Sequence, residues 1–286
     1  LYFESSTTTP FHFLIQSELS TAPSRAQRDL PYRSFDIDAG IDHLQQLGVK
    51  YYAASSQVAT AKAQQHPALN EIANSGPWTI FKVKNSELVA QLDFEPAIFD
   101  HLKHSEWLNP SVEVFQEGSQ AVVRTLGGMN DWQHVDLEGE PEKIGLPQVE
   151  VSGINVDTDR IEFKVDKTGV PVMVKTSYFP NWKAKGAEGP WRATPNLMVV
   201  VPTEKEVSLE YGRSPIEIVS ILLTLAGLIS LAFVARKPNS LDFSSPWFDL
   251  NLILPDIDKR LNKWSKSSSG ENQIETSEML HEEVQS

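Results

Sequence analysis

The densest group of side chains able to bind a ligand lies between Ser177 and Asn196. It combines flat aromatic rings with amide and guanidinium groups. This set suits sugars, because the apolar faces of a sugar stack on rings while its hydroxyls take hydrogen bonds. The candidate glycan-contact residues are Tyr178, Asn181, Trp182, Trp191, Arg192 and Asn196. The same pattern also fits a hairpin whose rings fill a protein core, or an aromatic belt at a membrane interface.

Metal and nucleophile chemistry has less support in the sequence. His101 and His104 have a spacing that can share one helix face, but a third ligand is not apparent, so we expect solvated loop histidines and no metal site. His12 and His43 are isolated and are expected to be structural. The chain has no cysteine, and it carries no glycine-rich phosphate loop, nucleophile elbow or HExxH zinc motif. We therefore expect no cofactor and identify no catalytic residue.

A long apolar segment near the C-terminus is the strongest physical signal. Ile218–Ala235 contains no charged residue and, as a helix, extends about 27 Å, close to the ~30 Å hydrocarbon core of a bilayer. A buried core helix is the alternative, but such helices usually have a polar face. The sequence therefore predicts one transmembrane helix over residues 214–236, with Pro215 in its first turn.

Charges beside this segment predict its orientation. Arg236 and Lys237 follow it directly, and basic residues stay cytoplasmic. We expect residues 1–214 outside a bacterial plasma membrane and residues 237–286 in the cytoplasm. No signal-peptide pattern opens the chain, so export of a large region predicts an earlier span in a longer parent. The net charge of −13 argues against a nucleic-acid partner, which requires a basic face.

The fold class predicted for the whole chain is α+β, in five segments. Residues 1–34 form an extended loop region with at most one short helix, residues 35–147 a small layered α/β unit, and residues 148–213 an antiparallel β-sandwich. The transmembrane helix follows. The polar tail begins with an amphipathic stretch, Pro246–Trp264, which lies at the inner leaflet or against parent helices, and ends in disorder.

Local patterns specify the elements of the two folded segments. Asp38 is expected to cap a helix that ends at Gly48. The helices and strands expected after it are a buried strand Val49–Ala54, a helix Ser56–Asn74 interrupted at Pro67, a strand Trp78–Val83 paired with Leu88–Leu92, and short strands Val112–Phe115 and Ala121–Thr125. The sandwich strands are expected at Val149–Ile154, Arg160–Val165, Val170–Tyr178, Asn196–Val201 and Val207–Tyr211.

Several motifs together resemble a known family. They are Ser177-Tyr178-Phe179-Pro180-Asn181-Trp182, Arg192-Ala193-Thr194-Pro195-Asn196-Leu197-Met198-Val199-Val200, Val207-Ser208-Leu209-Glu210-Tyr211-Gly212, and, near the start, Leu30-Pro31-Tyr32-Arg33 and His43-Leu44-Gln45-Gln46-Leu47-Gly48. The combination resembles the C-terminal region of YfhO-like bacterial membrane proteins. It is also similar to actinobacterial multi-pass proteins grouped as 6-pyruvoyl-tetrahydropterin synthase-related.

The resemblance implies a parent organised like GT-C glycosyltransferases, which transfer sugars from polyprenyl-phosphate carriers in cell-envelope glycan assembly. This chain would be its extracytoplasmic C-terminal module and last span. Its partners would be the lipid bilayer, upstream helices of the parent, and a polyprenyl-phosphate sugar or envelope glycan. The family's acidic catalytic residue lies in an early outer loop, so it corresponds to no residue here. The alternative is a non-enzymatic, membrane-anchored scaffold or glycan-binding module.

Overall fold

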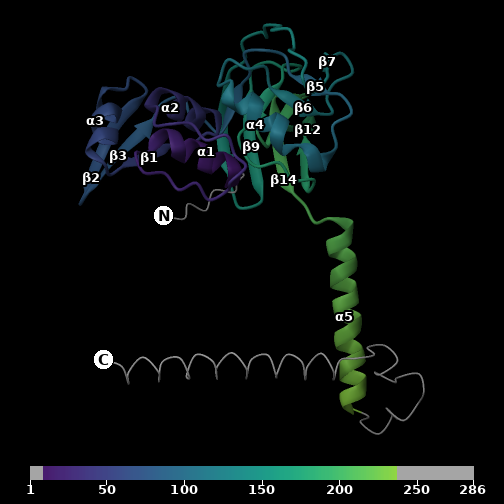
Figure 1. The fold of residues 1–286 in the computed structure, drawn as a ribbon. Coiled ribbons are helices and arrows are strands. Elements are labelled where there is room, and N and C mark those ends of the chain that lie inside the picture. Colours follow the sequence, from purple (N-terminus) through teal and green to yellow (C-terminus); the bar gives the residue numbers. More distant parts are fainter. Residues whose placement is uncertain (1–8, 237–286) are drawn as a thin grey trace, which may run out of the picture. The chain divides into compact units, whose positions relative to one another are not determined.

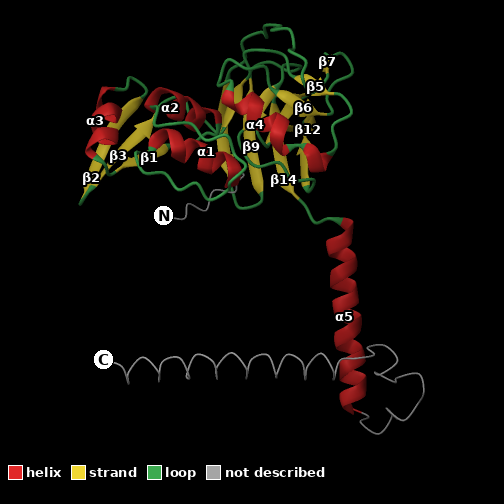
Figure 2. Ribbon diagram, viewed as in Figure 1, coloured by secondary structure: helices red, strands yellow, loops and turns green. Residues whose placement is uncertain are grey.

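The computed structural model describes residues 9–236, and the chain divides into two compact units that meet between Ser214 and Pro215. The described chain is mixed α/β, with helices and largely antiparallel sheets (Figure 2). The predictions for the tail, Pro246–Trp264 included, lie outside the described residues.

The first part of the larger unit packs helices with a small sheet. Helices α1 and α2 lie side by side, and α3 lies with the three-stranded antiparallel sheet of order β1-β3-β2 (Figure 1). The bounds are α1 Thr9–Leu19, α2 Ile37–Gln46, β1 Tyr51–Ala54, α3 Gln57–Gln65, β2 Leu69–Ser75 and β3 Trp78–Val83. Apolar side chains of all three helices join one core, among them Leu14, Ile41 and Ala63.

Helix α2 begins at a different cap from the one predicted. Asp36, in extended conformation with φ −147°, is the N-cap, and its carboxylate accepts hydrogen bonds from the N–H groups of Asp38 and Ala39. Asp38 lies inside the first turn, where its negative charge interacts favourably with the positive end of the helix dipole. The predicted end is confirmed, because Leu47 is the C-cap and Gly48 follows with φ +68°.

Four further predictions were wrong in part. The helix after Ser56 ends at Gln65, and residues 69–75 form strand β2, because Pro67 breaks the helix. Strand β1 is exposed at alternate residues, because its side chains point alternately to the two faces of the sheet and only one face is buried. The stretch 112–115 belongs to helix α4, whose buried residues lie on one helical face despite their β-branched types. The strand at 89–91 pairs with β10 rather than β3.

Two larger sheets make up the rest of this unit. A seven-stranded sheet has the order β4-β10-β13-β12-β6-β5-β7, and a four-stranded sheet has the order β11-β14-β9-β8. The bounds are β4 Val89–Gln91, β5 Ala97–Phe99, η1 His104–Glu106, α4 Leu108–Gln116, β6 Arg124–Leu126, β7 His134–Val135, β8 Val151–Val156, β9 Arg160–Val165, β10 Val172–Val174, β11 Trp182–Lys185, β12 Ala187–Ala193, β13 Leu197–Pro202 and β14 Glu206–Tyr211. The seven-stranded sheet takes strands from both sides of the boundary predicted at 147–148, so these two segments share hydrogen bonds.

One apolar cluster contains side chains of both sheets. Val172, Met198 and Val200 come from the seven-stranded sheet, while Phe163 and Leu209 come from the four-stranded sheet, and all are at most 1% exposed. Burial of this size stabilises each side chain by about 1.5–3 kcal/mol. Each strand predicted within 149–211 overlaps an observed strand, although β10 is shorter than predicted, and these strands are divided between the two sheets.

Helix α5 (Pro215–Arg236) forms the described part of the second unit. Its segment Pro215–Phe233 has a mean hydropathy of 2.3 and is long and apolar enough to cross a membrane. The hydroxyls of Ser220, Thr224 and Ser230 each donate to the carbonyl four residues earlier, at 2.8 Å. These hydroxyls therefore have partners within the helix and do not require water.

Candidate ligand-binding cleft

The aromatic residues predicted to contact glycan fall on different faces of the structure. Trp191 and Arg192 are neighbours on β12, so their side chains leave opposite faces of the sheet. Trp191 packs on the core beneath the helices, with its ring centroid 5.2 Å from that of Trp132. This tryptophan therefore contributes to packing.

Arg192 belongs to a second cluster, which holds the turn between β12 and β13. Its Nε donates to Oδ1 of Asn196 at 2.6 Å, and its guanidinium carbon lies 4.6 Å from the ring centroid of Trp107. The backbone N–H of Tyr178 donates to the Asn196 carbonyl at 2.8 Å. Burial lowers the pKa of Arg192, and Tyr178 opposes that change. Three of the six candidates, Tyr178, Arg192 and Asn196, thus meet here.

Asn181 and Trp182 lie at a third place, the end of β14. The Trp182 ring contacts that of Tyr211 at 5.3 Å between centroids, and Nδ2 of Asn181 donates to the Gly212 carbonyl at 2.9 Å. The six candidates therefore occupy three locations. A glycan contact at any one of them stays a prediction.

A cleft of about 660 Å³ opens in the larger unit, and none of the six candidates lines it. Its wall is formed by five parts of the chain. They are helix α2, the segment around β4, the C-terminal half of α4 with the residues that follow it, strand β10, and the β12–β13 turn. Its polar lining consists of Asp42, Gln45, Gln46, Asn85, Glu87, Gln91, Asp93, Ser119, Lys175 and Thr194. Its apolar lining includes Leu92, Phe94, Phe115, Met173 and Leu197. The volume lies within the range of small-molecule sites.

Hydrogen bonds within the protein fix three side chains of the lining, those of Asp42, Gln45 and Gln46. The Asp42 carboxylate accepts from the Ser119 backbone N–H at 2.8 Å and from Nε2 of Gln46 at 3.1 Å. Nε2 of Gln45 donates to the Lys84 carbonyl at 2.8 Å. These contacts orient amide and carboxylate groups before a ligand arrives, which lowers the entropy that binding must overcome.

The cleft carries a negative charge balance. Its lining has three carboxylates, from Asp42, Glu87 and Asp93, and one ammonium group, from Lys175. Nζ of Lys175 already donates to the Gln45 carbonyl at 2.7 Å. Burial lowers the pKa of Lys175, while the nearby Glu87 acts in the opposite direction. A neutral or cationic ligand fits this balance better than an anionic one.

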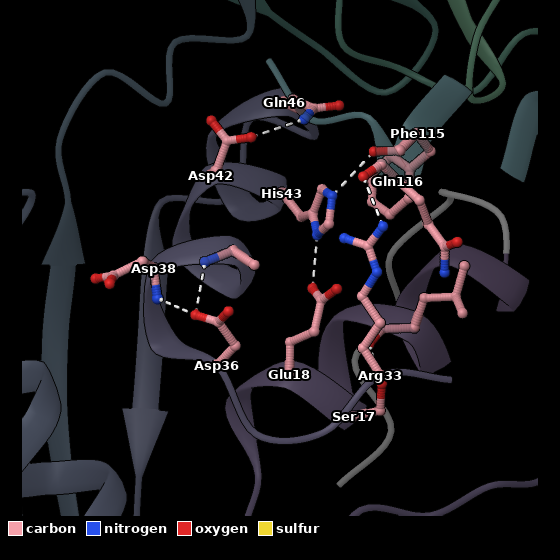
Figure 3. A network of polar contacts seen from close by, with 12 residues as sticks. Ser17, Glu18, Arg33, Asp36, Asp38, Asp42, His43, Gln46, Phe115 and Gln116 are labelled. Carbon is pink, nitrogen blue, oxygen red and sulfur yellow. Dashed lines mark hydrogen bonds and ion pairs between the residues drawn. The ribbon is translucent and has the colours of Figure 1, made fainter. Parts of the chain in front are cut away.

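A buried ionisable pair supports the wall of the cleft (Figure 3). Nδ1 of His43 lies 2.6 Å from Oε2 of Glu18, its Nε2 lies 2.9 Å from the Phe115 carbonyl, and its ring stacks on that of Phe115 at 4.2 Å. Because a carbonyl oxygen only accepts, Nε2 donates to Phe115, and a second hydrogen bond joins Nδ1 to Oε2 of Glu18. The pair links α1, α2 and α4, and Phe115 lines the cleft.

Sequence reasoning identified neither this pair nor the cleft. His43 follows an apolar helical pattern, and its partner lies 25 residues earlier on another helix, so spacing does not connect them. The cleft residues come from segments that are distant in the sequence, and the pairing of β4 with β10 is one of the contacts that bring them together. A weak signal existed in α2, where Asp42, Gln45 and Gln46 interrupt the apolar positions with polar ones.

Among residues 9–236, no group of three or more histidine, aspartate or glutamate side chains is placed to hold a metal ion. His101 and His104 are both exposed, the first with φ +57° in a loop and the second at the start of η1.

Comparison of the chain with family models, with curated proteins and with solved structures finds no match.

Proposed function

We propose that residues 9–214 are a membrane-anchored binding module that takes a neutral, hydroxyl-rich ligand, such as a short glycan, in the cleft. The observation that carries the proposal is the lining: oriented amide and carboxylate groups surround apolar side chains in a volume of about 660 Å³. Sugar hydroxyls pair with such groups, and the apolar faces of sugar rings pack on part-exposed side chains such as Leu92 and Phe94.

The charge of the cleft favours the glycan over the phosphate part of the ligands that the sequence suggests. Three carboxylates against one ammonium group disfavour a phosphate in the cleft. The proposal therefore assigns the glycan part of a lipid-linked or envelope saccharide to the cleft, and leaves a polyprenyl-phosphate head outside it.

The proposal also gives the module a wider role, as the extracytoplasmic part of a GT-C-like membrane protein of the cell envelope. The family resemblance and the basic flank after the apolar segment support it, with residues 9–214 outside the plasma membrane, α5 as the last span, and the parent's upstream helices as partners. The apolar cluster shared by the two larger sheets supports a β-sandwich as the scaffold of the module.

The test is a binding titration of the full chain in lipid nanodiscs with neutral envelope oligosaccharides. Asp93→Ala and Gln46→Ala should each weaken binding about tenfold, the equivalent of one lost hydrogen bond of 1.4 kcal/mol. Asp29→Ala is the matched control, since Asp29 is exposed like Asp93 but does not line the cleft. This variant should bind as tightly as the unsubstituted chain.

Two outcomes contradict the proposal. If Trp182→Ala abolishes binding while Asp93→Ala does not, the glycan contacts the aromatic residues at the end of β14. If the unsubstituted chain binds none of the oligosaccharides, a scaffold role replaces glycan binding.

A further inference from the structure

One end of the four-stranded sheet exposes several large apolar side chains. Val156 at the end of β8 is 56% exposed, Phe179 just before β11 is 54% exposed, and Tyr211 at the end of β14 is 39% exposed. The N–H of Tyr211 donates to the Asp159 carbonyl in the β8–β9 turn at 2.7 Å, which places that turn beside the end of β14. Single exposed apolar residues are ordinary, but a group of them marks an interaction surface.

Contacts hold this group in a fixed geometry. The ring centroid of Tyr211 lies 6.0 Å from that of Phe179 and 5.3 Å from that of Trp182. Asn181 and Gly212 are joined by two hydrogen bonds, from the Gly212 N–H at 3.0 Å and from Nδ2 of Asn181 at 2.9 Å. The chain is therefore bound to the sheet up to Gly212, and the rings belong to the folded unit.

Chain length limits how far this group can be from the apolar helix. Pro215 begins α5, and four Cα–Cα steps separate it from Tyr211, so the two Cα atoms are at most about 15 Å apart. The polar interface on each side of a bilayer is roughly 5–8 Å thick. Tyrosine and tryptophan concentrate at that depth, because their rings are apolar and their O–H or N–H groups remain hydrated.

We propose that Val156, Phe179, Trp182 and Tyr211 form a lipid-contact surface that enters the headgroup boundary of the bilayer crossed by α5. The inference goes beyond glycan binding and rests on the proposed membrane anchoring by α5. Phe179 inserts its exposed ring, which contacts Tyr211, and Tyr211 in turn contacts Trp182. A second attachment point restricts rotation about the short segment 213–214.

The absence of cysteine from the sequence allows a direct test by site-directed spin labelling. The full chain is reconstituted in phosphatidylcholine vesicles with one nitroxide label, at Val156→Cys or at Phe179→Cys. Collision with lipid-soluble oxygen is compared with collision with a water-soluble nickel chelate. Ile72→Cys on β2 is the matched control, because Ile72 is 52% exposed. Leu225→Cys, in the middle of α5, reports on the anchor itself.

The expected result is an oxygen-to-nickel ratio at positions 156 and 179 severalfold above that at position 72 and below that at position 225. Phe179→Ser should return the label at position 156 toward the value at position 72. If positions 156 and 179 match position 72 while position 225 is deep in lipid, the lipid-contact surface is refuted and the anchor stands. If neither reagent reaches the labels, a second copy of the chain covers this surface and the lipid-contact surface is refuted. If position 225 is open to the nickel chelate, the anchor and the inference both fail.

Discussion

Replacing His43 by leucine tests whether the buried pair holds α1, α2 and α4 together. Both side chains of the pair are almost completely enclosed, with Glu18 and His43 each 1% exposed. His43→Leu removes the partner of Oε2 and leaves the Glu18 carboxyl group in an apolar surrounding. Removing one member of a buried pair costs about 3–5 kcal/mol. The lost contact to Phe115 adds little, because its carbonyl still accepts from the Gly118 N–H at 3.1 Å.

The size of the expected change in melting temperature follows from the size of the unit. A domain of this length loses about 2–4 °C of Tm per kcal/mol, so His43→Leu should lower the Tm by roughly 6–20 °C. Glu18→Leu leaves Nδ1 of His43 without its partner, which costs about 1–3 kcal/mol. The double variant Glu18→Leu/His43→Leu buries no unpaired group, so it should be more stable than the sum of the single changes predicts.

Far-ultraviolet circular dichroism of the full chain in detergent gives the four melting curves of this cycle. The transition of the β-rich unit is the one to compare, since α5 forms a separate unit. Two results would refute the reasoning by showing that the pair contributes no coupling. One is that the losses of stability in the two single variants simply add in the double variant. The other is that His43→Leu has the same melting temperature as the unsubstituted chain.

Three further changes test individual contacts. Asp36→Ala should lower the free energy of unfolding by about 0.5–2 kcal/mol, because it removes the N-cap of α2, and Asp38→Ala should lower it clearly less. Urea unfolding measures both values. Equal losses would contradict the assignment of Asp36 as the cap. Lys175 has a lowered pKa through burial, so between that value and its ordinary 10.5 the unfolded chain binds more protons, and the free energy of unfolding should rise with pH. Lys175→Met should flatten that rise in alkaline unfolding curves, and an unchanged slope would contradict the assignment. Gly186 has φ +74°, and an added Cβ meets the Glu206 carbonyl oxygen, so Gly186→Ala should cost about 1–3 kcal/mol in backbone strain and more from the collision, measured as a lower Tm; an unchanged Tm would contradict this.

Elements with a strong local pattern were predictable from the sequence. The uncharged stretch 218–235 is helical, and the strand Arg160–Val165 shows the alternation that its residues predicted, with Ile161, Phe163 and Val165 buried. Both follow from near-neighbour periodicity, which does not depend on distant contacts.

Pairing between distant strands was not predictable. Strand β4 has three residues and joins β10, more than 80 positions later, so nothing in its own composition selects that partner. Tertiary packing also overrode propensity at 112–115, where valines that favour strands cover one face of helix α4. The cleft depends on these long-range contacts, which is why its residues could not be grouped from the sequence.

The cleft itself is tested most directly by amide hydrogen exchange of the full chain, with and without a saturating neutral envelope oligosaccharide. The account predicts slower exchange in residues 85–93 and 116–121, which border the cleft, and no change in residues 178–182. Protection confined to residues 178–182, or no protection anywhere at a concentration that saturates binding, would contradict it.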